Sequence, residues 1–316
     1  MDNITHTLTG LALSRAGLDR FYVRAPLLLM ISANMPDMDL ATVVSGGLYY
    51  FEQHRGITHS VVMAPLVAIL PLLFVLLISR SRAGWLRGYC LSLVGVLSHL
   101  TFDWTNAYGI RLLKPVSGQW FHADLNNIVD VWIWAVLILA WLGPLLGRLV
   151  SSEIGAKPGR GRGLAIFALL FIIAYDGGRY LIHERVLAAL NSRVYEGSPP
   201  ILSGAFPVAV NPLRWVAWVN TERLAIRYEF NAATEFDPLA GTKFYRPENT
   251  PAIDAAKTTL PVQVMRNFAL YPLWILSPTD EPEGGTRVEL RDERFPFVAT
   301  AIVNRSAQVV SSNFHY

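Results

Sequence analysis

The stretch that decides the fold is residues 88–108, GYCLSLVGVLSHLTFDWTNAY, an apolar run that carries a histidine and an aspartate. About 20 apolar residues cross a bilayer as a helix. His99 and Asp103 are four residues apart, so in a helix they lie on one face, one turn from each other. Ionisable side chains are expensive in a membrane and mark functional sites there. The run predicts a membrane helix that supplies two metal ligands, and a His–Asp hydrogen bond between packed helices is the alternative.

The whole chain is too apolar for an ordinary soluble protein of its size. Of its 316 residues, 52% are hydrophobic and only 16% are charged, which is typical of membrane proteins. Further apolar stretches of about spanning length lie at residues 25–50, 61–79, 128–150 and 164–182. A polar cluster interrupts the first of them. The sequence therefore predicts an α-helical, multi-span membrane domain with about five spans, the first one broken.

Basic residues gather in three of the predicted loops. Arg15, Arg20 and Arg24 precede the first span, and further basic residues lie at 80–87 and 148–162. By the positive-inside rule these loops face the cytoplasm, so the remaining loops and the C-terminal part lie on the other side. No cleavable signal peptide is evident at the start of the chain. The net charge of +3 is too small to indicate a nucleic-acid partner.

The character of the chain changes after the last apolar stretch. Residues 198–200, Ser-Pro-Pro, mark a linker, and short β-branched and aromatic runs follow, separated by Pro, Gly and Asn. Large apolar side chains alternate along residues 224–230 with the smaller or charged Ala225, Arg227 and Glu229, which is the period of a strand with one buried face. We expect a membrane-embedded helical domain over residues 1–190 and an antiparallel β-rich extramembrane domain over residues 198–316.

A second histidine cluster, His54-Arg55-Gly56-Ile57-Thr58-His59-Ser60, stands just before the apolar stretch 61–79. Thr58 can cap the helix that follows, and the positive end of the helix dipole keeps the imidazole of His59 neutral and available as a ligand. Gly56 lets the loop turn back, which can bring His54 toward the same place. His54 is equally explained as a solvated loop residue.

A third cluster, Asn34-Met35-Pro36-Asp37-Met38-Asp39, breaks the first apolar stretch. Irregular polar backbone at membrane depth is tolerated only when it is buried in protein or lines a wet cavity. We expect Asp37 to bind metal, and Asp39 to orient a ligand, bind a second ion or accept a proton. A kinked helix with both acids solvated at the membrane edge is the alternative.

His6 and Asp130 are less certain members of the same site. If the segment around His6 dips into the membrane, the histidine is displaced toward the side where the other clusters lie. An interfacial helix without a site explains it as well. Asp130 begins the apolar stretch 128–150 and is either an acid favoured by the helix dipole or a further ligand.

Two arginines are candidate phosphate-binding groups. Arg111 follows the His99–Asp103 segment in a loop, and Arg179 lies three residues after Asp176. An arginine fork suits a phosphate, but Arg179 and Asp176 are more simply an ion pair. His183 and His315 have no comparable neighbours.

The clusters, in order and spacing, resemble the YdjM-like family of metal-dependent hydrolases of bacterial inner membranes. The resemblance rests on Met1-Asp2-Asn3-Ile4-Thr5-His6, Met35-Pro36-Asp37-Met38-Asp39, the His54–Ser60 cluster and His99-Leu100-Thr101-Phe102-Asp103. It covers roughly the first 130 residues, and Asn211-Pro212-Leu213-Arg214-Trp215 with the β-rich tail is similar to the longer members.

That family is distantly similar to the zinc-dependent phospholipase C and single-strand nuclease superfamily, a helical fold with a multinuclear zinc site. The resemblance implies metal roles for five residues: His6, Asp37, His59, His99 and Asp103. The superfamily's later histidine pair and its partnered glutamate have no clear counterpart downstream. One or two ions are therefore expected, with zinc the first choice because imidazoles and carboxylates suit it.

These observations predict a hydrolase of the bacterial inner membrane with its active site on the non-cytoplasmic side. A metal-activated water would attack the substrate, with Asp39 or Asp130 accepting a proton. The resemblance to the superfamily implies a phosphoester of a lipid or lipid carrier as the substrate. Two other classes remain open. A transporter of metal ions or protons can use the same intramembrane groups, and a scaffold protein can keep them for packing alone.

Overall fold

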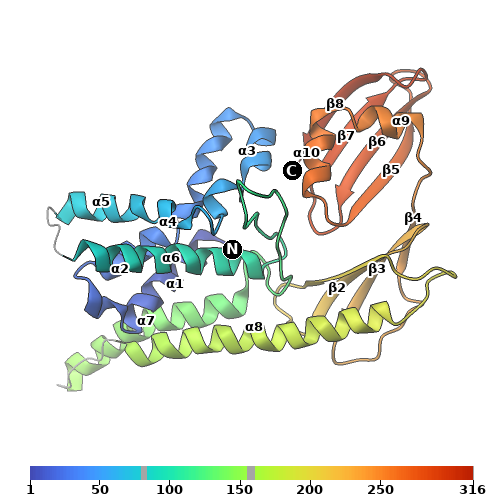
Figure 1. Ribbon diagram of the computed structural model, residues 1–316. Coiled ribbons are helices and arrows are strands. Elements are labelled where there is room, and N and C mark those ends of the chain that lie inside the picture. Colours follow the sequence, from blue (N-terminus) through green and yellow to red (C-terminus); the bar gives the residue numbers. More distant parts are fainter. Residues whose placement is uncertain (80–83, 155–160, 316) are drawn as a thin grey trace. The chain divides into compact units, whose positions relative to one another are not determined.

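The computed structural model describes residues 1–79, 84–154 and 161–315 (Figure 1). The N-terminal region is helical, and its elements follow in order: α1 (Asn3–Arg15), η1 (Leu18–Phe21), α2 (Ala25–Ser32), η2 (Met35–Ser45), α3 (Gly47–Gln53), η3 (Ile57–His59), α4 (Ala64–Val67), α5 (Ile69–Ser79), α6 (Trp85–Thr105), α7 (Val131–Ile154) and α8 (Arg162–Asn191). The three η elements are 3-10 helices, and two of them carry residues of the predicted clusters.

Small residues let the helices around the site pack closely. A Cβ on Gly10 of α1 would stand 2.6 Å from the backbone oxygen of Leu29 in α2, and one on Gly95 of α6 would stand 2.6 Å from Ser32 Cβ. Close approach through small residues is a common way for membrane helices to associate. The side chain of Asp2 accepts hydrogen bonds from Ile4 N and Thr5 N and so begins α1. α1, α2 and α6 therefore form a tight frame.

Two helical stretches are long and apolar enough to cross a membrane. One is Val131–Leu149 within α7, and the other is the whole of α8. Two helix pairs pass the same test together but are bent, Ala25–Ser32 with Met35–Ser45 by 44° and Gly47–His59 with Ala64–Ser79 by 89°. The described residues thus hold two candidate spans, or up to four if each bent pair is one span. The break predicted in the first span is confirmed. α6, at 21 residues, is not among these candidates, since its polar residues make it less apolar.

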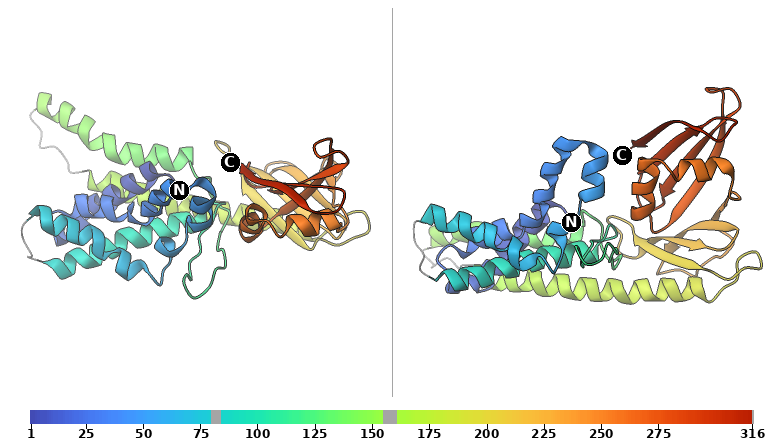
Figure 2. Two further views of the ribbon diagram at one scale, coloured as in Figure 1. Left: turned by 90° about the horizontal axis from the view of Figure 1, so that it is seen from above. Right: turned by 45° about the horizontal axis from the view of Figure 1, so that its top comes forward.

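The orientation of these helices stays a prediction. Part of the evidence for it, the basic residues Arg80, Arg82, Lys157 and Arg160, lies outside the described residues. α8 runs as one continuous helix of 30 residues (Figure 2).

The C-terminal region contains two antiparallel four-stranded sheets, as predicted in kind. Their strands are paired in sequence order: β1 (Leu202–Pro207), β2 (Arg214–Asn220), β3 (Leu224–Asn231) and β4 (Thr242–Tyr245), then β5 (Pro272–Thr279), β6 (Gly285–Asp292), β7 (Val298–Val303) and β8 (Val309–His315). In the second half of β3 the predicted alternation is confirmed, because Tyr228 and Phe230 are buried while Glu229 between them is exposed; Ala225, predicted on the other face, is also buried. Helices α9 (Pro251–Ala256) and α10 (Leu260–Phe268) pack on β6, β7 and β8.

The chain divides into two compact units. The first, called the helical unit below, comprises Met1–Ala41, Gln53–His183 and Pro207–Pro212, and it contains every predicted metal ligand. The second, called the C-terminal unit, comprises Thr42–Glu52, Glu184–Phe206 and Leu213–Tyr316. Within the second unit, the ring of Phe51 in α3 lies 4.8 Å from that of Phe268 in α10. The domain boundaries predicted from the sequence, at residues 190 and 198, stay a prediction.

Candidate metal centre

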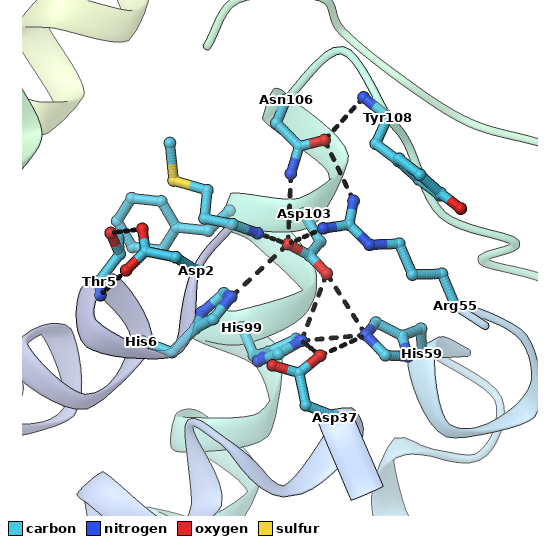
Figure 3. A network of polar contacts seen from close by, with 12 residues as sticks. Asp2, Thr5, His6, Asp37, Arg55, His59, His99, Asp103, Asn106 and Tyr108 are labelled. Carbon is cyan, nitrogen blue, oxygen red and sulfur yellow. Dashed lines mark hydrogen bonds and ion pairs between the residues drawn. The ribbon is translucent and has the colours of Figure 1, made fainter. Parts of the chain in front are cut away.

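Four of the five predicted metal ligands converge on one point in the helical unit (Figure 3). Asp37 comes from η2, His59 from η3, and His99 and Asp103 from successive turns of α6. One donor atom of each side chain can be chosen so that all four lie within 4.8 Å of one another. His59, His99 and Asp103 are fully buried, and Asp37 is partly buried. The structure thus gathers these ligand types from three separate segments.

Five of the six separations between these atoms are close to the edge length of a small tetrahedron. His59 Nε2 lies 3.1 Å from His99 Nε2, and each is 3.3 Å from Asp103 Oδ2. Asp37 Oδ1 lies 3.4 Å from His59 Nε2 and 3.7 Å from His99 Nε2. Around a tetrahedral zinc with bonds of about 2.0–2.1 Å, neighbouring donors stand roughly 3.3 Å apart. Five separations therefore agree with a zinc-sized centre.

The outer nitrogens of both imidazoles have acceptor partners. His99 Nδ1 lies 2.7 Å from the carbonyl oxygen of Ala33, and a carbonyl can only accept, so this nitrogen carries the proton. His59 Nδ1 lies 3.4 Å from Asp39 Oδ2 and 3.1 Å from Thr58 Oγ1, and the carboxylate favours a proton there as well. Both Nε2 atoms then present lone pairs to the same point, which is how backbone and carboxylate partners orient metal-binding histidines.

Four acceptor atoms facing one another need a cation. When both imidazoles are neutral and carry the proton on Nδ1, neither Nε2 can donate a hydrogen bond to the other imidazole or to a carboxylate. Asp103 Oδ2, one of the four atoms, is buried without a hydrogen-bond partner among the described residues. An unpaired buried carboxylate oxygen is costly unless a charge compensates it. The donor set, two imidazoles and two carboxylates, fits a divalent metal ion of the zinc type.

The fifth predicted ligand, His6, lies beside this centre but outside the four-donor group. Its ring stacks on His99 with centroids 3.7 Å apart, and its Nε2 lies 3.5 Å from Asp103 Oδ1. Neither ring nitrogen has a hydrogen-bond partner within residues 1–79, 84–154 and 161–315. α1, which Asp2 caps, places His6 in this position.

Arg55 is a residue of the centre that the sequence analysis missed. It is buried, and its guanidinium places Nη2 3.2 Å from Asp103 Oδ1 while Nη1 donates to Asn106 Oδ1 and to the carbonyl of Gly109, each at 3.1 Å. The amino group of Met1 also contacts Asp103 Oδ1. Asp103 thus has one oxygen toward the four-donor group and the other toward cations. The position of Arg55 inside the His54–Ser60 cluster was the sequence signal that could have assigned it to the centre.

Asp39 supports the centre from behind His59. Its carboxylate accepts a hydrogen bond from the backbone N–H of Arg55 at 2.8 Å and lies 3.2 Å from His54 Nδ1. Together with the contact to His59 Nδ1, these interactions connect η2 to the histidine loop, residues His54–Ser60. Of the roles predicted for Asp39, orienting a ligand is the one these contacts support. His54 contacts Asp39 through Nδ1, so the structure brings it to the edge of the site.

The other predicted residues are engaged elsewhere in the helical unit. Asp130 caps α7, because its Oδ1 accepts from Trp132 N at 3.0 Å and from Ile133 N at 3.3 Å. Its Oδ2 lies 3.8 Å from Arg179 Nη1, and this arginine also donates to Tyr175 at 2.6 Å. Asp130 therefore takes the helix-start position that was one of its two predicted readings.

Arg111 stabilises the histidine loop by a hydrogen bond to its backbone. Its Nη2 donates to the backbone oxygen of His54 at 3.0 Å, and its guanidinium lies 5.1 Å from the centre of the Trp120 ring. A Cβ on Gly56 would stand 3.1 Å from Arg111 Nη2 and 2.6 Å from Gln53 O. Glycine at this position is therefore required for the close approach of the loop and the arginine.

The comparisons with known proteins agree with this picture. The model of the YdjM inner membrane protein family matches residues 1–186, which include all the residues of the centre. The chain is also 28% identical over 206 residues to the uncharacterized protein YfhP of Bacillus subtilis (strain 168). That match covers 62% of this chain and 58% of the length of the relative. No solved structure matches the chain significantly. With more than half of its length matched, and with the motifs of the helical unit folded into one buried His/Asp cluster, the chain belongs to the YdjM inner membrane protein family.

Proposed function

We propose that the protein is a membrane-embedded, metal-dependent hydrolase that cleaves a phosphoester of a lipid or lipid carrier, with zinc as its ion. The observation that carries the proposal is the donor geometry, two imidazole nitrogens and two carboxylate oxygens separated by 3.1–3.7 Å in five of their pairs. The acceptors beside both Nδ1 atoms, the Ala33 carbonyl and the Asp39 carboxylate, favour a prepared metal site over packing alone.

Asp37, His59, His99 and Asp103 would hold the ion. When bound there, a divalent ion supplies an acidified water and a Lewis acid that polarises a phosphoester. The two carboxylates balance its charge, and Arg55 pairs with the outer oxygen of Asp103, Oδ1, and so holds that carboxylate in place. Asp39 orients His59 through Nδ1 and so acts as a positioning residue. His6 Nε2, beside Asp103 Oδ1, can hold a second ion or accept a proton.

The substrate class rests on two supports. The superfamily resemblance points to phosphoesters, which is an analogy at the level of the fold. The location among candidate membrane spans favours a lipid or lipid-linked molecule over a soluble one. The non-cytoplasmic side is part of the proposal and follows from the positive-inside rule.

Elemental analysis of the purified protein, paired with lipid mass spectrometry of cells that have and lack it, tests the proposal. The expected result is about one or two zinc ions per chain and accumulation of one phosphorylated lipid in cells without the protein. Stoichiometric zinc without any change in the lipids, and without hydrolysis of a lipid extract, would reject the hydrolase.

A metal-ion transporter is the second candidate, and one observation favours it. Asp37 lies in the bent pair Ala25–Ser32 and Met35–Ser45, and transporters bind ions at broken helices. Zinc uptake into liposomes that contain the protein separates the two functions. Uptake that saturates and that Asp37→Asn abolishes would favour the transporter.

A further inference from the structure

A shallow cavity of about 500 Å³, wide open on one side, is lined by residues of α1, α2 and η2 and reaches the metal centre at Asp37. Thr7, Asn34 and Asp37 are among its polar lining, and Met30, Ile31 and Met38 are among its apolar lining. Of the four residues in the donor group, only Asp37 lines this cavity, with 14% of its side chain exposed against 0% for the others. This is the side from which a molecule can approach the ion.

The polar lining offers acceptors that have no donor. Asn34 Nδ2 donates to Thr7 Oγ1 at 2.9 Å and to the carbonyl of Met30 at 2.8 Å, which fixes the orientation of its amide. Asn34 Oδ1 is then an acceptor, and it is buried without a hydrogen-bond partner among the described residues, as is Asp37 Oδ2. Such atoms call for a ligand that brings donors. Hydroxyl and ammonium groups meet this requirement.

The apolar lining suits a hydrocarbon chain. Methionines at positions 30, 35 and 38 and Ile31 line the cavity together. Methionine side chains are flexible and polarisable, so they adapt to chains of different shape. Met38 is 44% exposed, which places apolar surface where the cavity opens. Ligand sites of this size combine apolar walls with a few polar groups that fix orientation.

We propose that this cavity binds an amphiphilic phosphoester with a hydroxyl- or ammonium-bearing head group, and that it is the route by which substrate reaches the ion. The head group lies along Asn34 and Asp37, and the hydrocarbon chain lies along the methionines. The inference rests on the proposed function and adds to it the approach of the substrate and the chemistry of its head group.

The test uses the full chain in a phosphorus-free non-ionic detergent and a short-chain phosphatidylglycerol as the probe. Native mass spectrometry reads both bound probe and any product. Met38→Trp narrows the opening of the cavity, and Leu40→Trp is the matched control, because Leu40 lies in the same helix η2, is 56% exposed and does not line the cavity. Met38→Trp should weaken probe binding at least about tenfold, while Leu40→Trp should leave it unchanged, and both should retain their zinc.

A second variant tests the head-group contact without filling the cavity. The unsubstituted protein should bind phosphatidylglycerol about tenfold more tightly than phosphatidylmethanol, which lacks the hydroxyl donors. Asn34→Leu should remove this preference at unchanged zinc content.

Equal binding of the probe to Met38→Trp and to the unsubstituted protein, or an unaltered preference in Asn34→Leu, would overturn the inference even if lipid is hydrolysed. Binding as expected without any hydrolysis would instead reject the proposed function and leave the cavity as a lipid site.

Discussion

Replacing His99 by alanine is the sharpest test of the metal centre. Its Nε2 takes part in three of the five separations that define the donor group, to His59, Asp103 and Asp37. Protein zinc sites are worth about 10–16 kcal/mol, so one ligand of four carries about 3 kcal/mol. That loss weakens zinc binding on the order of 100-fold. The assay is zinc content after dialysis against a competing chelator of known affinity.

His183→Ala is the control for this experiment. His183 is also buried, at 8% exposure, but it lies in α8 and outside the donor group. Its replacement should leave the zinc affinity unchanged, and the abundance and detergent behaviour of both variants should show that each still inserts and folds. Full zinc retention by His99→Ala would refute the four-donor reasoning and leave the packing scaffold as the better account.

Further predictions concern the supports of the centre, the sheets and the topology. Removing zinc by chelation should lower the thermal unfolding midpoint, since an ion at 100 times its Kd stabilises the folded state by about 2.7 kcal/mol; calorimetry with and without added zinc checks this. Arg55→Lys should weaken zinc binding about 10–100-fold, because lysine cannot keep the contacts of Arg55 to both Asp103 and Asn106; competition with a chelator measures it. Burial raises the pKa of Glu289, but hydrogen bonds from Arg291 and Arg287 outweigh this and hold the pKa below its usual range. The carboxylate therefore stabilises the sheet above its unfolded-state pKa, and this contribution is lost as the pH falls through the folded-state pKa. The protection of β6 amides against hydrogen exchange, corrected for the intrinsic exchange rate at each pH, should therefore depend less on pH in Glu289→Gln. Cysteine labelling should reach the C-terminal unit from the non-cytoplasmic side alone, and labelling from the cytoplasm would reverse the orientation.

Local patterns predicted the parts of the fold that depend on neighbours in sequence. The four-residue spacing of His99 and Asp103 places both on one face of α6, where the structure has them. Pro36, with the acids that follow it, predicted the break between α2 and η2. In the second half of β3, alternation predicted which face is buried. These signals work because helix and strand periods are properties of the backbone.

Features that depend on distant contacts could not be predicted in this way. Arg55 follows a histidine and precedes a glycine, which in sequence describes a solvated loop, yet α6 and the loop after it bury its guanidinium. β5 begins with one proline and contains another, Pro278, so its composition argues against a strand. Proline is tolerated in this strand because β5 lies at the edge of its sheet and pairs with β6 alone. Among the described elements, β1, β4, α9 and α10 also lacked a clear signal.

The order of the ligands along the chain has a consequence for biogenesis. All four members of the donor group lie between residues 37 and 103, so they are synthesised while about two thirds of the chain is still to be made. Domains generally fold from the N-terminus as they are synthesised. The centre can therefore take up its ion during membrane insertion, before either sheet exists. An ion captured at that stage would hold η2, η3 and α6 together and offset the cost of burying the polar side chains of His99 and Asp103 without partners.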